Sequence, residues 1–191
     1  MDSQKDVRRT ATSEFGSLRN VSEDDLADML AWRNSPSVRS KMFTQHVIAW
    51  EEHVRWWNAV KDRKDQIHFI YEFQNEPLGV VIFKDVDTLN KSSSWAFYAK
   101  PDAPKGTGSR MELLALNFIF LEFGMEYLYC EVLSSNEAVV GLHQKFGFSI
   151  KERLAEQRIG AQIFDFVRLG IERREWLQRR DEVMARMLSA R

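Results

Sequence analysis

The sequence has a single cysteine, Cys130, among its 191 residues, and only four histidines. One cysteine cannot form an internal disulfide, which favours a reducing compartment such as the cytoplasm. We expect Cys130 to be a small buried hydrophobe and not a nucleophile. The histidines lack the close spacing of metal ligands, so we expect no metal site. They are His46, His53, His68 and His143.

Long apolar runs are also missing. No stretch approaches the roughly 20 apolar residues of a membrane-spanning helix, and the polar beginning lacks the apolar core of a secretory signal. A net charge of -1 provides no bulk attraction to nucleic acid or to a membrane surface. We therefore expect a soluble, cytoplasmic protein with neither of these partners.

What the chain does have is enough apolar sequence, 44% of its residues, to build one buried core. We expect a flexible polar tail over residues 1–13, a single domain over 14–170 and a charged helix over 171–191. Edge strands of such a domain can pair, which permits a homodimer.

Apolar periodicity predicts an α/β chain in the order strand, two helices, three strands, helix, strand, helix, two strands. Ser22 is the predicted N-cap of the first helix, which Asn34-Ser-Pro36 ends. The expected strands cover residues 15–19, 67–73, 78–84, 93–99, 127–132, 149–158 and 162–169, with the last turn near Gly160. The later helices are expected at 50–61, 109–123, 137–145 and 171–187.

A glycine-containing turn, Lys105-Gly-Thr-Gly-Ser109, joins the third of the three central strands to the helix that follows. Free amide groups and aligned peptide dipoles at a helix N-terminus favour a phosphate. The same residues could simply let the chain change direction. The turn alone therefore leaves both interpretations open.

A second pattern, Asn136-x6-His143-x3-Gly147-Phe148, lies downstream. With both patterns and this element order, the chain resembles the GNAT family of acetyl-CoA-dependent N-acetyltransferases. The resemblance implies the GNAT fold: a central mixed, largely antiparallel, twisted sheet of about seven strands. It implies helices on both faces of the sheet and a splay between the fourth and fifth strands.

The resemblance also implies that the residues of the turn bind the pyrophosphate of acetyl-CoA through their main-chain amides. Ala103 stands where the family has arginine or glutamine, which removes one side-chain donor. Strand amides near Phe97 and Tyr98 would meet the oxyanion. The full set implied for the coenzyme is Phe97, Tyr98, Lys105, Gly106, Thr107, Gly108, Ser109, Asn136 and Lys145.

A narrower resemblance concerns the first half of the chain. The run Leu30-Ala-Trp-Arg-Asn-Ser-Pro36, the pair Met42-Phe43 and the helix carrying His53 look like pseudaminic-acid-pathway acetyltransferases. Those enzymes acetylate the 4-amino group of a UDP-linked 4-amino-4,6-dideoxy-N-acetyl-L-altrosamine, a precursor of flagellin glycans. RimJ/RimL-like protein N-terminal acetyltransferases share part of this pattern.

The narrower resemblance implies a nucleotide-sugar acceptor. Glu131 matches a family position and would be the base that deprotonates the sugar amine, although a solvent-facing carboxylate is the plainer interpretation. His143 stands where many GNAT enzymes have a tyrosine, and it would protonate the departing sulfur. The residues implied for the acceptor are Arg33, Met42, Phe43, His53, Trp56, Trp57, Tyr98 and Glu131, and we expect at least one of the two tryptophans to be ordinary core.

Two other functions stay open at this point. One is acetylation of a protein N-terminus or of a small polyamine. The other is a catalytically silent acyl-CoA-binding module, which the missing acid tyrosine would permit.

Overall fold

The computed structural model describes residues 10, 13–159 and 161–189. The tail expected over residues 1–13 and the turn at Gly160 lie almost wholly outside these residues. One seven-stranded sheet organises the described part of the chain, in the order β1-β2-β3-β4-β5-β7-β6. Its strands are β1 (Ser17–Asn20), β2 (Ile67–Phe73), β3 (Glu76–Asp87), β4 (Ser92–Ala99), β5 (Tyr127–Leu133), β6 (Ser149–Ile159) and β7 (Gln162–Glu172).

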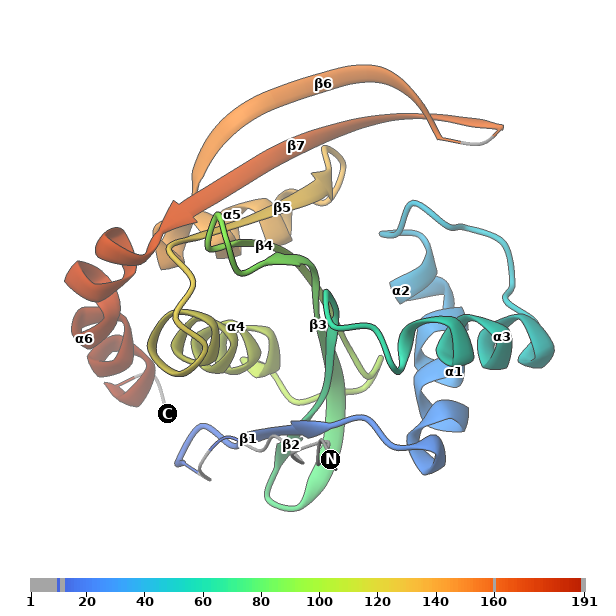
Figure 1. Ribbon diagram of the computed structural model, residues 1–191, viewed down its shortest axis with the longest axis horizontal. Coiled ribbons are helices and arrows are strands. Elements are labelled where there is room, and N and C mark those ends of the chain that lie inside the picture. The colour runs from blue at the N-terminus through green and yellow to red at the C-terminus, as the bar shows by residue number, and fades with distance from the viewer. Residues whose placement is uncertain (1–9, 11–12, 160, 190–191) are drawn as a thin grey trace.

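Helices cover both faces of this sheet, as the GNAT resemblance implies. The sheet curls around α4, whereas α1, α2 and α3 form a separate group on its outer side (Figure 1). The helices are α1 (Leu26–Asn34), α2 (Pro36–Arg39), α3 (Trp50–Val60), α4 (Thr107–Asn117), α5 (Glu137–Phe146) and α6 (Arg173–Ser189). None of the helices in the described ranges is long and apolar enough to cross a membrane.

Strand alternation divides the apolar residues between two cores. On β2, Phe69 and Tyr71 face the larger cluster around α4, whereas Ile70 between them belongs to the smaller cluster with α1 and α3. All three side chains are fully buried. The alternating pattern of this strand is typical of a half-buried strand, whereas in the structure both of its faces are covered, one by each cluster.

The predicted splay lies between β4 and β5, which are the parallel pair of the sheet. Their ladder holds only three residue pairs, from Ser92↔Tyr127 to Ser94↔Tyr129. Beyond Ser94, β4 continues its antiparallel ladder with β3 as far as Ala99, while β5 pairs with β7 as far as Leu133. The two strands therefore part at their C-terminal ends and leave a gap in the sheet.

Three element predictions need correction. A short helix, α2, begins at Pro36, where only the end of α1 was expected; proline suits the first position of a helix. The helix predicted over 109–123 begins at Thr107 and changes at Phe118 into a π-helical turn, η2 (Phe118–Glu122). The last helix begins at Arg173, because Ile171 and Glu172 extend β7.

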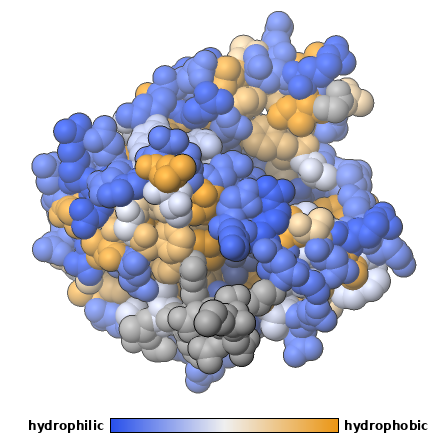
Figure 2. Space-filling model, in the orientation of Figure 1, coloured by the Kyte–Doolittle hydropathy of each residue, from blue (hydrophilic) through white to orange (hydrophobic). Residues whose placement is uncertain are grey.

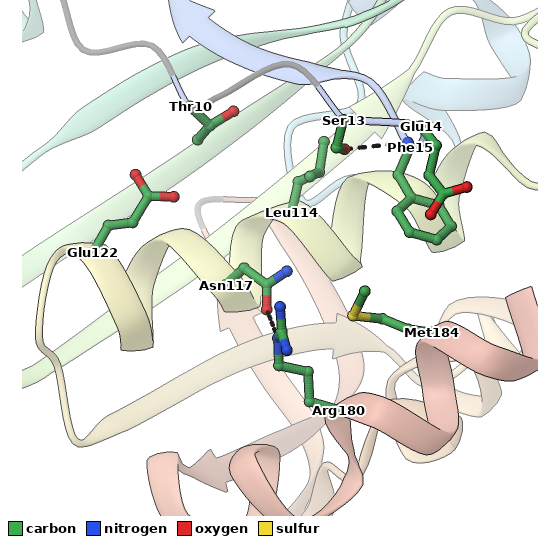
Figure 3. Close-up of a pocket in the computed structure, with 9 residues that line it drawn as sticks. All are labelled: Thr10, Ser13, Glu14, Phe15, Leu114, Asn117, Glu122, Arg180 and Met184. Carbon is green, nitrogen blue, oxygen red and sulfur yellow. Dashed lines mark hydrogen bonds between the residues drawn. The ribbon is translucent and has the colours of Figure 1, made fainter. Parts of the chain in front are cut away.

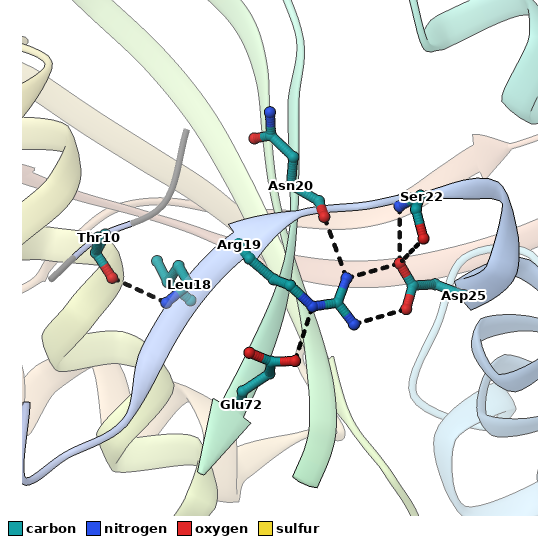
Figure 4. A network of polar contacts seen from close by, with 7 residues as sticks. All are labelled: Thr10, Leu18, Arg19, Asn20, Ser22, Asp25 and Glu72. Carbon is teal, nitrogen blue, oxygen red and sulfur yellow. Dashed lines mark hydrogen bonds and ion pairs between the residues drawn. The ribbon is translucent and has the colours of Figure 1, made fainter. Parts of the chain in front are cut away.

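A polar network fastens β1 to the start of the helical group (Figure 4). The guanidinium of Arg19 donates to both carboxylate oxygens of Asp25 at 2.8 Å and to Glu72 on β2 at 2.7 Å. Ser22 caps a 3-10 turn, η1 (Glu23–Asp25), which precedes α1, and its amide donates to Asp25. The network fixes the direction in which α1 leaves the sheet.

Candidate active site

The glycine turn ends in an open helix N-terminus. Gly106 is the N-cap of α4 with a φ of 87°, a left-handed conformation that glycine adopts without strain. The hydroxyl of Thr107 donates to the carbonyl of Pro104 at 2.7 Å, which closes the turn. Within the described part of the chain, no side chain caps this helix. The amide of Thr107 donates to Pro104 at 3.1 Å, but those of Gly108 and Ser109 have no acceptor among the described residues and are available to an anion such as a pyrophosphate.

The turn lies beside the open end of the splay. A Cβ on Gly108 would sit 3.7 Å from the ring of Phe97 on β4 and 3.4 Å from Leu142 on α5. Asn136 is the N-cap of α5, and two residues separate it from the end of β5. The structure thus brings Gly108 of α4, Phe97 of β4 and Leu142 of α5 together at this edge of the gap, whereas Lys105 is exposed just before α4 and Lys145 is exposed in the last turn of α5. These residues fit the coenzyme that the resemblance implies.

His143 is buried and paired. Its Nδ1 lies 2.8 Å from Oε1 of Glu112 on α4, and both side chains are almost completely enclosed. Burial alone would lower the pKa of His143, but the Glu112 carboxylate and the Cys130 thiol raise it to about 10. The ring also packs against Trp95, Phe97 and Phe148.

Glu131 lies on the other face of β5, between buried Cys130 and Val132, as the strand alternation predicts. Arg168 on β7 is its direct cross-strand partner and donates to its Oε1 from Nε at 3.1 Å and from Nη2 at 2.7 Å. About a third of the Glu131 side chain is exposed. The carboxylate is therefore anchored by one oxygen and reaches solvent beside the splay.

Arg33 and Tyr98 lie on that same face, opposite Phe97. Nη2 of Arg33 donates to the carbonyl of Thr44 at 2.9 Å, whereas Nη1 is buried with no hydrogen-bond partner among the described residues. Burial lowers the pKa of Arg33. Tyr98 raises this pKa to a smaller extent, and Arg39 lowers it further. A buried guanidinium nitrogen without an acceptor is costly unless a ligand supplies one.

The loop between α2 and α3 bridges the helical group and the β6–β7 hairpin. Asn34 holds it through two hydrogen bonds of 2.8 Å with the main chain of Ile48. From this loop, Phe43 packs edge-on against Phe164 and Phe166 of β7, with ring centroids 5.6 and 5.4 Å apart. Met42, beside it, is half-buried. Figure 2 shows the surface indented between the hairpin end and the helical group.

The remaining acceptor candidates form an aromatic stack on α3. His53 stacks on Trp56 with centroids 5.3 Å apart, and Trp57 meets the ring of His68 on β2 edge-on. Trp57 is core, as we expected for one of the two tryptophans, and His53 is also buried. The structure therefore places His53 inside the helix packing and keeps only Trp56 half-buried at its margin.

Sequence reasoning missed Glu112, Arg168 and Phe164. Glu112 is a lone carboxylate in the apolar run Met-Glu-Leu-Leu-Ala-Leu, and that isolation was the available signal. Arg168 is identified only by the strand register that places it opposite Glu131, and Phe164 only by its contact with Phe43 of a distant loop. No comparable local signal marks them.

A separate pocket of about 300 Å³ lies away from the splay, between the chain before β1, α4 and α6 (Figure 3). Arg180 donates to Asn117 at 2.9 Å beside this pocket. The pocket beside α6 is lined by none of the residues of the glycine turn, β4 or β5.

The described ranges contain no group of three or more potential ligands that could hold a metal ion.

Comparison with known proteins agrees with the geometry. The family model described as Acetyltransferase (GNAT) domain matches residues 17–149. Acetyltransferase PseH of Campylobacter jejuni is 27% identical over 136 residues, 70% of this chain and 84% of that protein. Spermidine N(1)-acetyltransferase of Escherichia coli is 24% identical over 162 residues, 84% of this chain and 87% of that protein.

A solved structure gives the same fold. Spermidine N-acetyltransferase from Vibrio cholerae, in complex with CoA and spermine, superposes with a TM-score of 0.77 at 21% identity. The match covers 84% of this chain and 96% of that one.

Proposed function

We propose, from the premise that the chain belongs to the GNAT family of acetyl-CoA-dependent N-acetyltransferases, that its acceptor is a UDP-linked 4-amino sugar. The transferred acetyl group would go to the 4-amino group of a UDP-4-amino-4,6-dideoxy-N-acetyl-β-L-altrosamine, as in pseudaminic acid biosynthesis and flagellin glycosylation. The similarity to PseH supports this choice. We propose the cytoplasm as its location.

The buried Nη1 of Arg33 is the observation that carries the proposal. The side chain lies close enough to Tyr98 of β4 and to Arg39 for both to affect its pKa, and Arg39 adds a second positive charge. A guanidinium forms paired, charge-assisted hydrogen bonds with phosphate oxygens, so a diphosphate would satisfy this nitrogen. A polyamine would bring further positive charge to the same place. Met42, Phe43 and Trp56 supply apolar surface for a nucleobase or a deoxysugar methyl group.

The chain's own groups have distinct parts in the transfer. Oε2 of Glu131 has no recorded hydrogen bond in the described structure and reaches solvent, so it would accept the proton of the sugar amine directly or through water. Strand amides of β4 beyond Ser94 have no ladder partner on the β5 side within the described residues and would meet the negative charge on the carbonyl oxygen. His143 would donate a proton to the departing sulfur.

Polyamine acetylation is the second candidate, because the spermidine acetyltransferases of E. coli and V. cholerae share this fold over most of the chain. The carboxylates of Glu131, beside the gap, and of Glu152, on β6, could attract a polycation, but Arg168 contacts both of them. The acceptor side is thus less acidic than its carboxylate count suggests.

A thiol-release screen separates these functions. Purified protein and acetyl-CoA would be offered the UDP-4-amino sugar, spermidine and a peptide with a free N-terminus, and each product identified by mass. Turnover with the nucleotide sugar at least tenfold above the others supports the proposal, and preference for spermidine or peptide contradicts it. Binding of acetyl-CoA with no acetylated product would make the chain a silent binding module.

A further inference from the structure

The core between α4 and α5 contains a carboxylate that contacts a histidine. Glu112 is fully buried, its Oε1 contacts His143, and its Oε2 has no partner within the described residues. Its helical neighbours Met111 and Leu113 are buried apolar residues. Replacing a buried ion pair by apolar residues of similar size is often neutral or stabilising, so packing alone gives no reason for this pair.

The position of the pair links two elements of the coenzyme site. Glu112 lies on α4 shortly after the phosphate-binding turn, and His143 lies on α5 shortly after Asn136. The imidazole is confined by aromatic rings at centroid distances of 5.0–5.9 Å from Trp95, Phe97 and Phe148. The carboxylate can therefore set both the orientation of the ring and the nitrogen that carries the proton.

Two titratable groups face the ring and raise the pKa of His143, whereas burial lowers that pKa and raises the pKa of Glu112. Glu112 faces it from α4 and the thiol of Cys130 from β5, and both favour the imidazolium. The groups on β4 and after α5 that touch it are apolar aromatic rings. With Nδ1–H held by Glu112, the second proton of the imidazolium is on Nε2.

We propose that Glu112 is a positioning residue that holds His143 as an oriented imidazolium, ready to protonate the coenzyme A thiolate. This inference rests on the proposed role of His143 as the acid. In the step, the Nε2–H bond breaks and an S–H bond forms, which leaves a neutral imidazole hydrogen-bonded to the carboxylate. The proton that the amine loses to Glu131 and solvent restores the imidazolium, so the proton count balances.

The test follows the protonation of His143 directly, with no acceptor needed. Protein labelled with ¹⁵N-histidine would be titrated from pH 5.5 to 9.5 with coenzyme A bound, and His143→Gln would assign the signal. We expect both ring nitrogens of His143 to carry protons at pH 8 in the unchanged protein. Glu112→Gln should lower its titration midpoint by at least about one pH unit. Glu122→Gln, farther along the same helical segment, should leave it unchanged.

Activity supplies the second reading. With the acceptor found by the screen, Glu112→Gln should reduce kcat at least tenfold at pH 8 and much less at pH 6, where His143 regains its proton. If Glu112 had a purely structural role, its replacement would lower kcat equally at the two pH values. A neutral His143 at pH 7.5 in the unchanged protein overturns the inference, even where the variant does not fold. An imidazolium without turnover of any amine instead overturns the proposed function and leaves the pairing established.

Discussion

Glu131 and Arg168 face each other across β5 and β7, and the guanidinium donates twice to the same carboxylate oxygen, Oε1. Arg168 also donates from Nη1 to Glu152 on β6 at 2.8 Å. One arginine thus holds two carboxylates, of which only that of Glu131 belongs to a strand beside the splay. The two glutamates form a matched pair for testing the proposed base.

Glu131→Gln should lower kcat about 100-fold, because it removes the proton acceptor and keeps the size of the side chain. Glu152→Gln removes the other partner of Arg168 and should change kcat by less than about threefold. Steady-state kinetics with the preferred amine, together with acetyl-CoA affinity from calorimetry, measures both effects. An equal loss of kcat in the two variants would show that Glu131 acts only through the net charge of the cluster of Glu131, Arg168 and Glu152.

Arg33→Lys should raise KM for the nucleotide sugar about tenfold or more and leave the Kd of acetyl-CoA unchanged. Lysine keeps the charge but loses the fork that would use the buried Nη1. Arg39→Lys, on α2, is the matched control, and we expect it to change KM little. The effect should also be absent for an amino sugar without the UDP group. A higher KM for both sugars would assign Arg33 to loop support through Thr44 alone.

The sequence was sufficient to predict β2 at its observed bounds and the glycine turn that precedes α4, because both depend on local patterns; the helix itself begins two residues earlier than expected. Contacts between distant segments were beyond it. Glu112 and His143 are 31 positions apart, and their pairing depends on how α5 packs against α4. Phe43 reaches Phe166 only because the loop after α2 crosses to the hairpin. Periodicity reports which face of an element is buried, and it contains no information about which element covers that face.

Gly106→Ala should cost about 1 kcal/mol of folding stability and weaken acetyl-CoA binding. The φ of 87° is unfavourable for a side chain, although an added Cβ would meet only the flexible Arg110, at 3.4 Å. Gly108→Ala has no such φ, and its Cβ would make an ordinary van der Waals contact with Leu142 at 3.4 Å. Thermal unfolding and calorimetric titration with coenzyme A compare the two. Wild-type affinity in Gly106→Ala would argue against a phosphate site formed by this backbone.

The stability of the protein should fall on acidification partly because of His68. Burial, with a smaller effect from Lys84, lowers the pKa of His68 from 6.5 to about 4. Between these values the unfolded chain binds a proton that the folded protein does not, so stability that is complete above pH 6.5 is lost as the pH falls toward 4. The loss attributable to this residue is on the order of 3 kcal/mol, at about 1.4 kcal/mol for each pKa unit.

His68→Phe should therefore reduce the difference in unfolding free energy between pH 7.5 and pH 4.5. Phenylalanine keeps the edge-on contacts with Trp56 and Trp57 and removes the titrating nitrogen Nε2, which is buried without a partner in the described structure. Urea unfolding at the two pH values measures the difference. His46→Gln is the matched control, because that histidine is largely exposed and should leave the acid loss almost unchanged. An acid loss in His68→Phe equal to that of the unchanged protein would assign the effect to other groups, such as His53, whose pKa burial also lowers.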